Sequence, residues 1–252
     1  MKQMKFLAIT FILLMGVAVT SCIDSDNGES ADTVTYVTIL DNSIYGGVTL
    51  LTDDGYYLVP TNSEVLKVST TEYAKRALVG VKWSEGVVFD RDRNKKYGMS
   101  IVAPLMGIPA KSYCNAPDTI KNSYPIVSMD ENSLWGANGN YLTLGFTFNY
   151  QNSTAISFDL FPYEADGDKL TMKLCQSVGS KNAYDSKDYI MSFELPASYT
   201  INELLQRHEG IQGIKGGELT VPANDTISVK IIADGTNSSA VETKYVKMRI
   251  RR

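Results

Sequence analysis

A strict alternation of large apolar residues with small or polar ones in residues 141–150 constrains the fold more than any other feature of this sequence. In YLTLGFTFNY the large apolar residues that alternate are Leu142, Leu144, Phe146, Phe148 and Tyr150. A period of two places all five on one face of a β-strand. The same pattern recurs in residues 156–160, 170–174, 189–195, 227–231 and 246–250. Six strands with one apolar face each predict an antiparallel β-sandwich.

One short helix is predicted to interrupt these strands. Thr200 and Glu203 have the spacing of a capping box, in which each side chain binds a backbone N–H at the start of a helix. The predicted helix continues through Leu204 and Leu205, and Gly210 ends it.

The first half of the chain has shorter strands. We expect them at residues 34–40, 48–51, 56–59, 77–83 and 97–103. The turn sequence DDG at 53–55 predicts a hairpin between the second and third of these strands. Five short strands in roughly 90 residues are typical of a small Greek-key barrel such as the OB-fold.

A connection rich in Pro, Asn and Ser, residues 114–125, separates the two patterns. The predicted fold class is therefore all-β, with a small OB-like barrel followed by an antiparallel β-sandwich. We expect four segments: a leader in 1–21, a flexible acidic tether in 22–32, the barrel in 33–125 and the sandwich in 126–252.

The leader has the layout of a bacterial lipoprotein signal. Lys2 and Lys5 precede a nearly uninterrupted apolar run, residues 6–19, which is followed by small residues and Cys22. The run is shorter than the ~20 apolar residues of a spanning helix, which favours a signal peptide. The tetrapeptide VTSC at 19–22 resembles a lipobox, whose cysteine is acylated and becomes the mature N-terminus. An ordinary secreted protein with a chance cysteine is the alternative.

The segment after Cys22, residues 23–30, is polar and acidic, which predicts a solvated tether. Its acidity also resembles the surface-export signal of some anaerobic Gram-negative lipoproteins. We therefore expect an outer-membrane lipoprotein that is surface-exposed or, failing that, faces the periplasm. Two of the 24 basic residues lie in the leader, so the mature chain, with 28 acidic residues, has a formal charge of −6. This mild acidity argues against nucleic acid as a partner and against electrostatic attraction to anionic lipid.

With Cys22 committed to lipid, Cys114 and Cys175 remain. Outside the cytoplasm such a pair can form a disulfide, and closing so long a loop would stabilise by roughly 4 kcal/mol. Cys175, however, shares its strand face with Thr171 and Lys173 rather than with the apolar residues. The sequence leaves a disulfide and two free thiols open.

Motifs for catalysis are sparse. His208 is the single histidine, and we expect it to be a surface or capping side chain. One histidine without a CxxC pair does not build a zinc site, and the chain has neither a G-x-S-x-G elbow nor a Walker loop. Glu164, Asp166 and Asp168 surround Gly167, which predicts a polar turn, with calcium binding as the alternative. We expect no enzymatic activity, no cofactor and no metal.

Aromatic residues give the strongest indication of binding. The chain has 15 tyrosines and two tryptophans, and aromatic rings on β-loops offer a large contact area for sugars. Candidates at predicted turns or strand ends are Tyr56, Tyr57, Trp83, Trp135 and Tyr141. The alternative is that Trp135 and Tyr141 fill the end of a domain as core residues.

Three triplets match the Asp-Ser/Thr-aliphatic signal for O-glycosylation of exported proteins in some anaerobic Gram-negative bacteria. They are DTV at 32–34, DTI at 118–120 and DTI at 225–227. The candidate carriers are therefore Thr33, Thr119 and Thr226, and the first two lie in predicted linkers, where a glycan would fit.

Several longer motifs occur in a fixed order. They are YVTIL at 36–40, GGVTLLTDDGYYLVP at 46–60, RALVGVKW at 76–83, LWGANGNYLTLGF at 134–146 and YIMSFEL at 189–195. Together with the leader they resemble the NigD-like lipoproteins of anaerobic Gram-negative bacteria, over most of the mature chain. The resemblance implies an N-terminal OB-like domain and a C-terminal β-sandwich. It implies no biochemical activity.

These features predict a lipid-anchored envelope or cell-surface lipoprotein that acts as a non-catalytic interaction or accessory module with a protein partner. The alternative is an extracellular glycan- or polymer-binding module that uses aromatic residues at β-loop ends. The first function predicts that exposed Tyr and Trp side chains form a protein-facing patch without a cleft. The second requires a concave groove in which aromatic residues are flanked by Asn and Asp.

Overall fold

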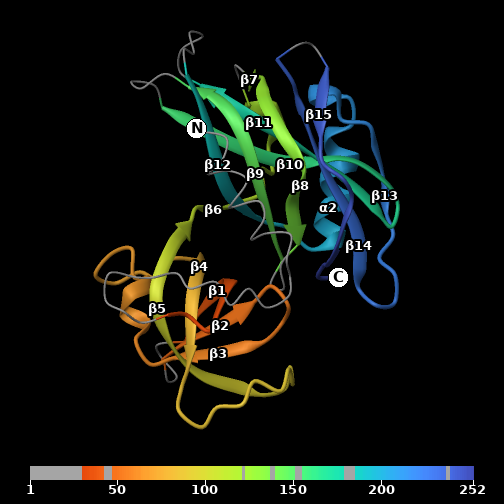
Figure 1. The fold of residues 1–252 in the computed structure, drawn as a ribbon. Coiled ribbons are helices and arrows are strands. Elements are labelled where there is room, and N and C mark those ends of the chain that lie inside the picture. Colours follow the sequence, from red (N-terminus) through yellow and green to blue (C-terminus); the bar gives the residue numbers. More distant parts are fainter. Residues whose placement is uncertain are drawn as a thin grey trace. The chain divides into compact units, whose positions relative to one another are not determined.

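The computed structural model describes most of the chain after the leader. The described residues are 30–42, 47–120, 123–136, 140–150, 155–178, 185–236 and 239–252, so the predicted leader and Cys22 lie outside them. The chain divides into two compact units, Met1–Pro109 and Ala110–Arg252. Figure 1 draws the first unit in red to yellow and the second in green to blue.

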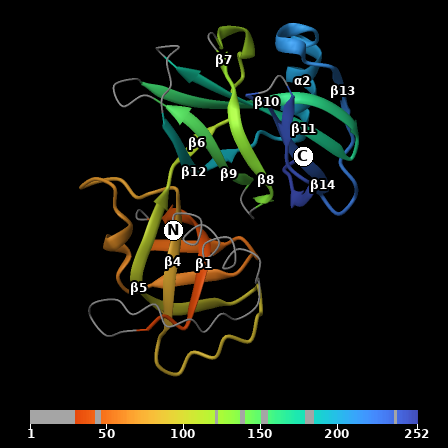
Figure 2. The ribbon, with the colours of Figure 1, turned by 45° about the horizontal axis from the view of Figure 1, so that its top comes forward.

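The first unit is a closed five-stranded barrel in the order β1-β2-β3-β5-β4. Its strands are β1 Thr33–Asn42, β2 Gly47–Thr52, β3 Tyr57–Pro60, β4 Arg76–Trp83 and β5 Lys96–Ile108. Neighbouring strands pair antiparallel except β3 and β5, which are parallel. Figure 2 shows β1, β4 and β5 beside one another. The predicted hairpin is confirmed, with Gly55 at φ +91° in the turn between β2 and β3.

The barrel is filled by side chains from alternate positions of its strands. Each strand contributes a residue that is at most 1% exposed: Val37, Leu50, Leu58, Val79 and Met99. A short 3₁₀ helix, η1 Ser63–Leu66, adds Leu66 to this core. Closure of the sheet leaves no unpaired edge in the barrel.

The second unit has two sheets. The seven-stranded sheet has the order β13-β10-β11-β14-β15, with β16 paired to β14 and β7 paired to β11. Its strands are β7 Ser123–Tyr124, β10 Ile156–Gly167, β11 Lys169–Val178, β13 Gly216–Leu219, β14 Thr226–Asp234, β15 Ala240–Glu242 and β16 Val246–Arg249. The four-stranded sheet comprises β6 Ala110–Ser112, β12 Asp185–Glu194, β9 Tyr141–Tyr150 and β8 Ile126–Gly136, in that order. The helices are α2 Ser198–His208, η2 Pro117–Thr119 and η3 Ile211–Gly213.

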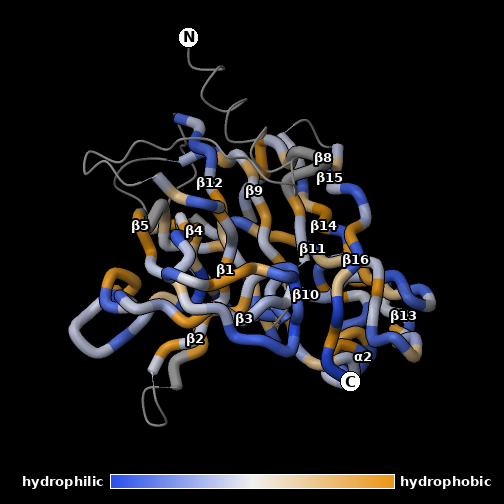
Figure 3. Tube along the Cα trace, turned by 60° about the horizontal axis from the view of Figure 1, so that its bottom comes forward, coloured by the Kyte–Doolittle hydropathy of each residue, from blue (hydrophilic) through white to orange (hydrophobic). Residues whose placement is uncertain are grey.

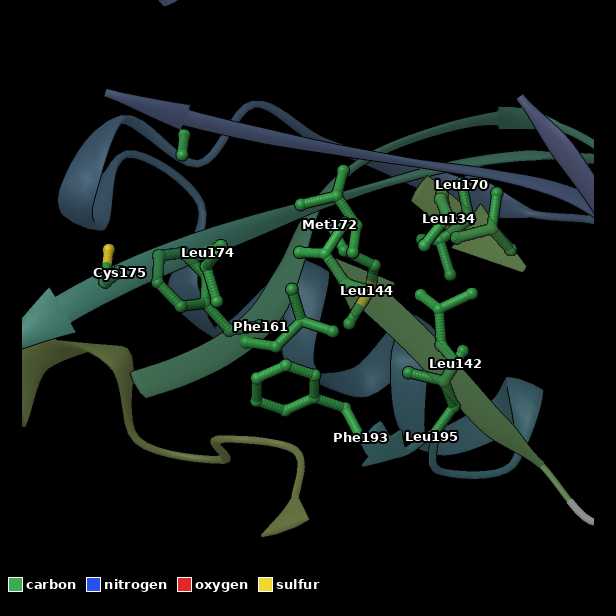
Figure 4. Close-up of a cluster of buried hydrophobic side chains, with 14 of the residues drawn as sticks. Leu134, Leu142, Leu144, Phe161, Leu170, Met172, Leu174, Cys175, Phe193 and Leu195 are labelled. Carbon is green, nitrogen blue, oxygen red and sulfur yellow. The ribbon is translucent and has the colours of Figure 1, made fainter. Parts of the chain in front are cut away.

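The apolar faces of the two sheets share one core. Leu144 from β9, Phe161 from β10, Met172 from β11 and Phe193 from β12 are fully buried and lie together in Figure 4. Ile201 and Leu205 of α2 join the same core. In Figure 3 hydrophobic residues are interspersed with hydrophilic ones along the strands, as the predicted alternation requires. The predicted all-β fold, a barrel and a two-sheet β unit, is confirmed.

Three details differ from the sequence prediction. The sheets are mixed, because β11 pairs with β14, β10 with β13 and β12 with β6 in parallel. Residues 110–125 belong to the second unit rather than the barrel, since β6 hydrogen-bonds with β12 and β7 with β11. Helix α2 begins at Ser198 after Ala197, which makes no side-chain cap, so Thr200 lies inside the helix and the capping box is wrong.

Candidate functional site

Four aromatic rings, here called the aromatic cluster, lie at the end of the barrel where β4 ends and β5 begins. They are Tyr56, Trp83, Phe89 and Tyr97. Phe89 is central: its ring stacks on Trp83 at 4.8 Å and 12°, and it meets Tyr56 and Tyr97 edge-on at 5.0 and 4.8 Å. The first three rings pack against the barrel core, and Tyr97 is part of it. The cluster therefore fills one end of the barrel.

Polar contacts fix the connection 84–95, which carries Phe89, over this end. The Tyr97 hydroxyl donates to Asp90 Oδ1 at 2.5 Å and accepts from the Asp92 N–H at 2.7 Å. Lys95 and Asp90 form an ion pair. Hydrogen bonds from Lys95 and then Tyr97 lower the pKa of Asp90 to about 2. The Arg93 guanidinium lies 5.7 Å from the Tyr56 ring centre, a cation–π distance.

Two of the aromatic residues singled out in the sequence, Tyr56 and Trp83, are thus brought together. Both rings are used in packing. Trp83 stacks on Phe89, and Tyr56 makes a T-shaped contact with the same ring. Tyr57 is the next residue but lies on the outer face of β3, 37% exposed. The sequence reading missed Phe89, whose position in a polar connection gave no periodic signal.

The other two candidates, Trp135 and Tyr141, belong to the second unit. They lie on the neighbouring strands β8 and β9. Tyr141 is buried and Trp135 half-buried. Tyr141 pairs with Glu194 and Trp135 with Thr143 within the four-stranded sheet. Burial of this kind fits the core interpretation of these residues better than an open binding face.

No disulfide joins Cys114 and Cys175. The Cys114 N–H donates to the Leu160 carbonyl of β10 at 2.8 Å, whereas Cys175 lies on β11 opposite Asp159. Because β10 runs between them, their backbones are separated by about two strand spacings of ~4.8 Å. A disulfide requires Cα atoms within ~7 Å. The disulfide that the sequence left open is therefore not formed.

Cys114 is expected to react with thiol reagents in the folded protein, slowly at pH 7 and faster as the pH rises past the ordinary thiol range. Burial raises its pKa, and the thiolate is the reactive form. Buried Cys175 should react only after denaturation. Rates of a chromogenic disulfide reagent from pH 7 to 10, with Cys114→Ser as the control, measure this. A mass of the unreduced protein that is lower by two hydrogens would show a disulfide and contradict this prediction.

The three candidate glycosylation threonines differ in exposure. Thr119 is exposed at the end of η2, and its hydroxyl donates to the Ala116 carbonyl at 2.7 Å. Thr33 and Thr226 are half-buried at the first positions of β1 and β14. Thr119 is therefore the most accessible of the three. Cys22, the lipidation candidate, lies outside the described residues.

His208 is buried, 8% exposed, so its predicted surface position is wrong. Within the described residues neither of its ring nitrogens has a hydrogen-bond partner. The predicted polar turn at Gly167 is confirmed as the connection of β10 to β11, with φ +59°. No group of three or more His, Cys, Asp or Glu side chains able to hold a metal occurs in the described part of the chain.

A buried ion pair on the barrel had no signal in the sequence. Arg76, at the start of β4, is 0% exposed and donates to both carboxylate oxygens of Asp53, at 2.5 and 2.9 Å. It also donates to the Thr38 hydroxyl at 3.0 Å. Burial, followed by the Asp53 charge, raises the pKa of the nearby Tyr36 to about 12. This arrangement holds β1, the β2–β3 turn and β4 together.

No helix among the described residues is both long and apolar enough to cross a bilayer. No family model and no curated protein matches the sequence.

Solved structures match in fold. A protein described as toxin-related from Parabacteroides distasonis is 18% identical, with a TM-score of 0.52 over 86% of this chain and 93% of that chain. A DUF1344 protein of unknown function from Bacteroides vulgatus is 14% identical, with a TM-score of 0.52 over 85% and 90%. A NigD-like immunity protein from Bacteroides caccae is 12% identical, with a TM-score of 0.47 over 85% and 96%. Over most of its length, the chain therefore has the fold of the P. distasonis and B. vulgatus proteins.

Proposed function

We propose that this chain is an outer-membrane lipoprotein, anchored by acyl chains on Cys22, whose barrel and sandwich form a non-catalytic interaction module. The observation that carries the anchor is the position of Cys22. It directly follows a leader-like segment and precedes the first barrel strand at Thr33 by a short polar stretch. Several acyl chains on one residue supply the hydrophobic surface that stable anchoring needs.

The geometry of the candidate residues favours an interaction role over catalysis. Tyr56 and Trp83 are packed into the barrel end, Tyr141 is buried, and the two thiols lie on opposite sides of β10. In the described part of the chain, both ring nitrogens of His208 are without a hydrogen-bonding carboxylate that could make it a general base. Packing of these candidate side chains supports surface recognition rather than catalysis as the function.

Replacing Cys22 by alanine is expected to move the full-length protein from the membrane fraction to the soluble fraction of the producing cell. The variant also loses the mass of the acyl chains, because no thiol remains to carry them. Cys114→Ala is the matched control and should stay in the membrane fraction with the acyl mass. Equal membrane association of Cys22→Ala and the unaltered protein would overturn the anchor.

The interaction role is tested in two experiments. Crosslinking of the full-length lipoprotein in whole envelopes should capture a protein partner. A glycan panel probed with residues 30–252, free of the anchor, should give no saturable binding, because the cluster rings face one another. Saturable binding that is lost in Trp83→Ala and kept in Trp135→Ala would instead favour the glycan-binding alternative.

A further inference from the structure

We draw no further inference here: the strongest candidate, the edge of strand β12 at residues 185–191, which β6 leaves without a paired strand in the described part of the chain, carries nothing, because nothing in the structure shows what covers it and its exposed charges, Asp185, Lys187 and Asp188, are typical of edges that avoid pairing.

Discussion

Replacing Asp53 by alanine is expected to lower the free energy of unfolding of the barrel by about 3–5 kcal/mol. The carboxylate receives two hydrogen bonds from Arg76, and the two side chains are 16% and 0% exposed. Without it, a buried guanidinium loses its counter-charge while its desolvation cost remains. Loss of one member of such a pair is far more costly than replacement of both.

The control for Asp53 is its neighbour Asp54, which is exposed. Asp54→Ala should change the free energy of unfolding by less than about 0.5 kcal/mol. Urea unfolding monitored by Trp83 fluorescence, with Trp135→Phe to silence the other tryptophan, reports on the barrel alone. The double variant Asp53→Leu/Arg76→Met should recover most of the loss. A loss below about 1 kcal/mol in Asp53→Ala would show that the pair contributes little.

Replacing Gly217 by alanine is expected to destabilise the second unit by about 2–5 kcal/mol, from backbone strain and overpacking together. Gly217 has φ +100°, and a Cβ built there lies 2.1 Å from the Ala165 carbonyl oxygen. That oxygen belongs to the strand paired with β13, so it cannot move aside without breaking the β10–β13 pairing.

A substitution at Gly167 distinguishes backbone strain from overpacking as the cause of the destabilisation. Gly167 also has positive φ, +59°, but a Cβ there meets nothing within 4 Å. Gly167→Ala should therefore show the strain alone, about 1–2 kcal/mol. Unfolding monitored by Trp135 in a Trp83→Phe background measures both variants. Equal losses at the two glycines would show that the close approach to Ala165 has no energetic effect.

The strands were predictable because their signal is local. The alternation in 141–150 coincides with β9, and five other predicted segments overlap β10, β11, β12, β14 and β16. Alternation says which face of a strand is buried but not which strand lies beside it. The parallel pairing of β11 with β14 and the inclusion of residues 110–125 in the second unit depend on such long-range choices. No local pattern carries them.

The difference between local patterns and long-range contacts also explains which residues of the candidate site the sequence did not predict. Tyr56 and Trp83 could be named from their residue type and predicted position, but their common neighbour Phe89 could not, since it lies in an irregular connection. Arg76 and Asp53 meet through the register of β1 with β4 and through the β2–β3 turn. His208 is buried because its helix packs on the core with the face that includes Leu204 and Leu205.

The order of the strands along the chain sets the order in which the two units can be completed. All five barrel strands lie within residues 33–108, so this unit has every strand once that segment has emerged. The seven-stranded sheet instead needs β14 to cover β11 and β16 to cover β14. Ser198, at the start of α2, donates its N–H to the carbonyl of Arg251. During synthesis, which proceeds from the N-terminus, the barrel can therefore fold before the last strands of the second unit are available, while residues 169–174 of β11 still lack β14 as a partner.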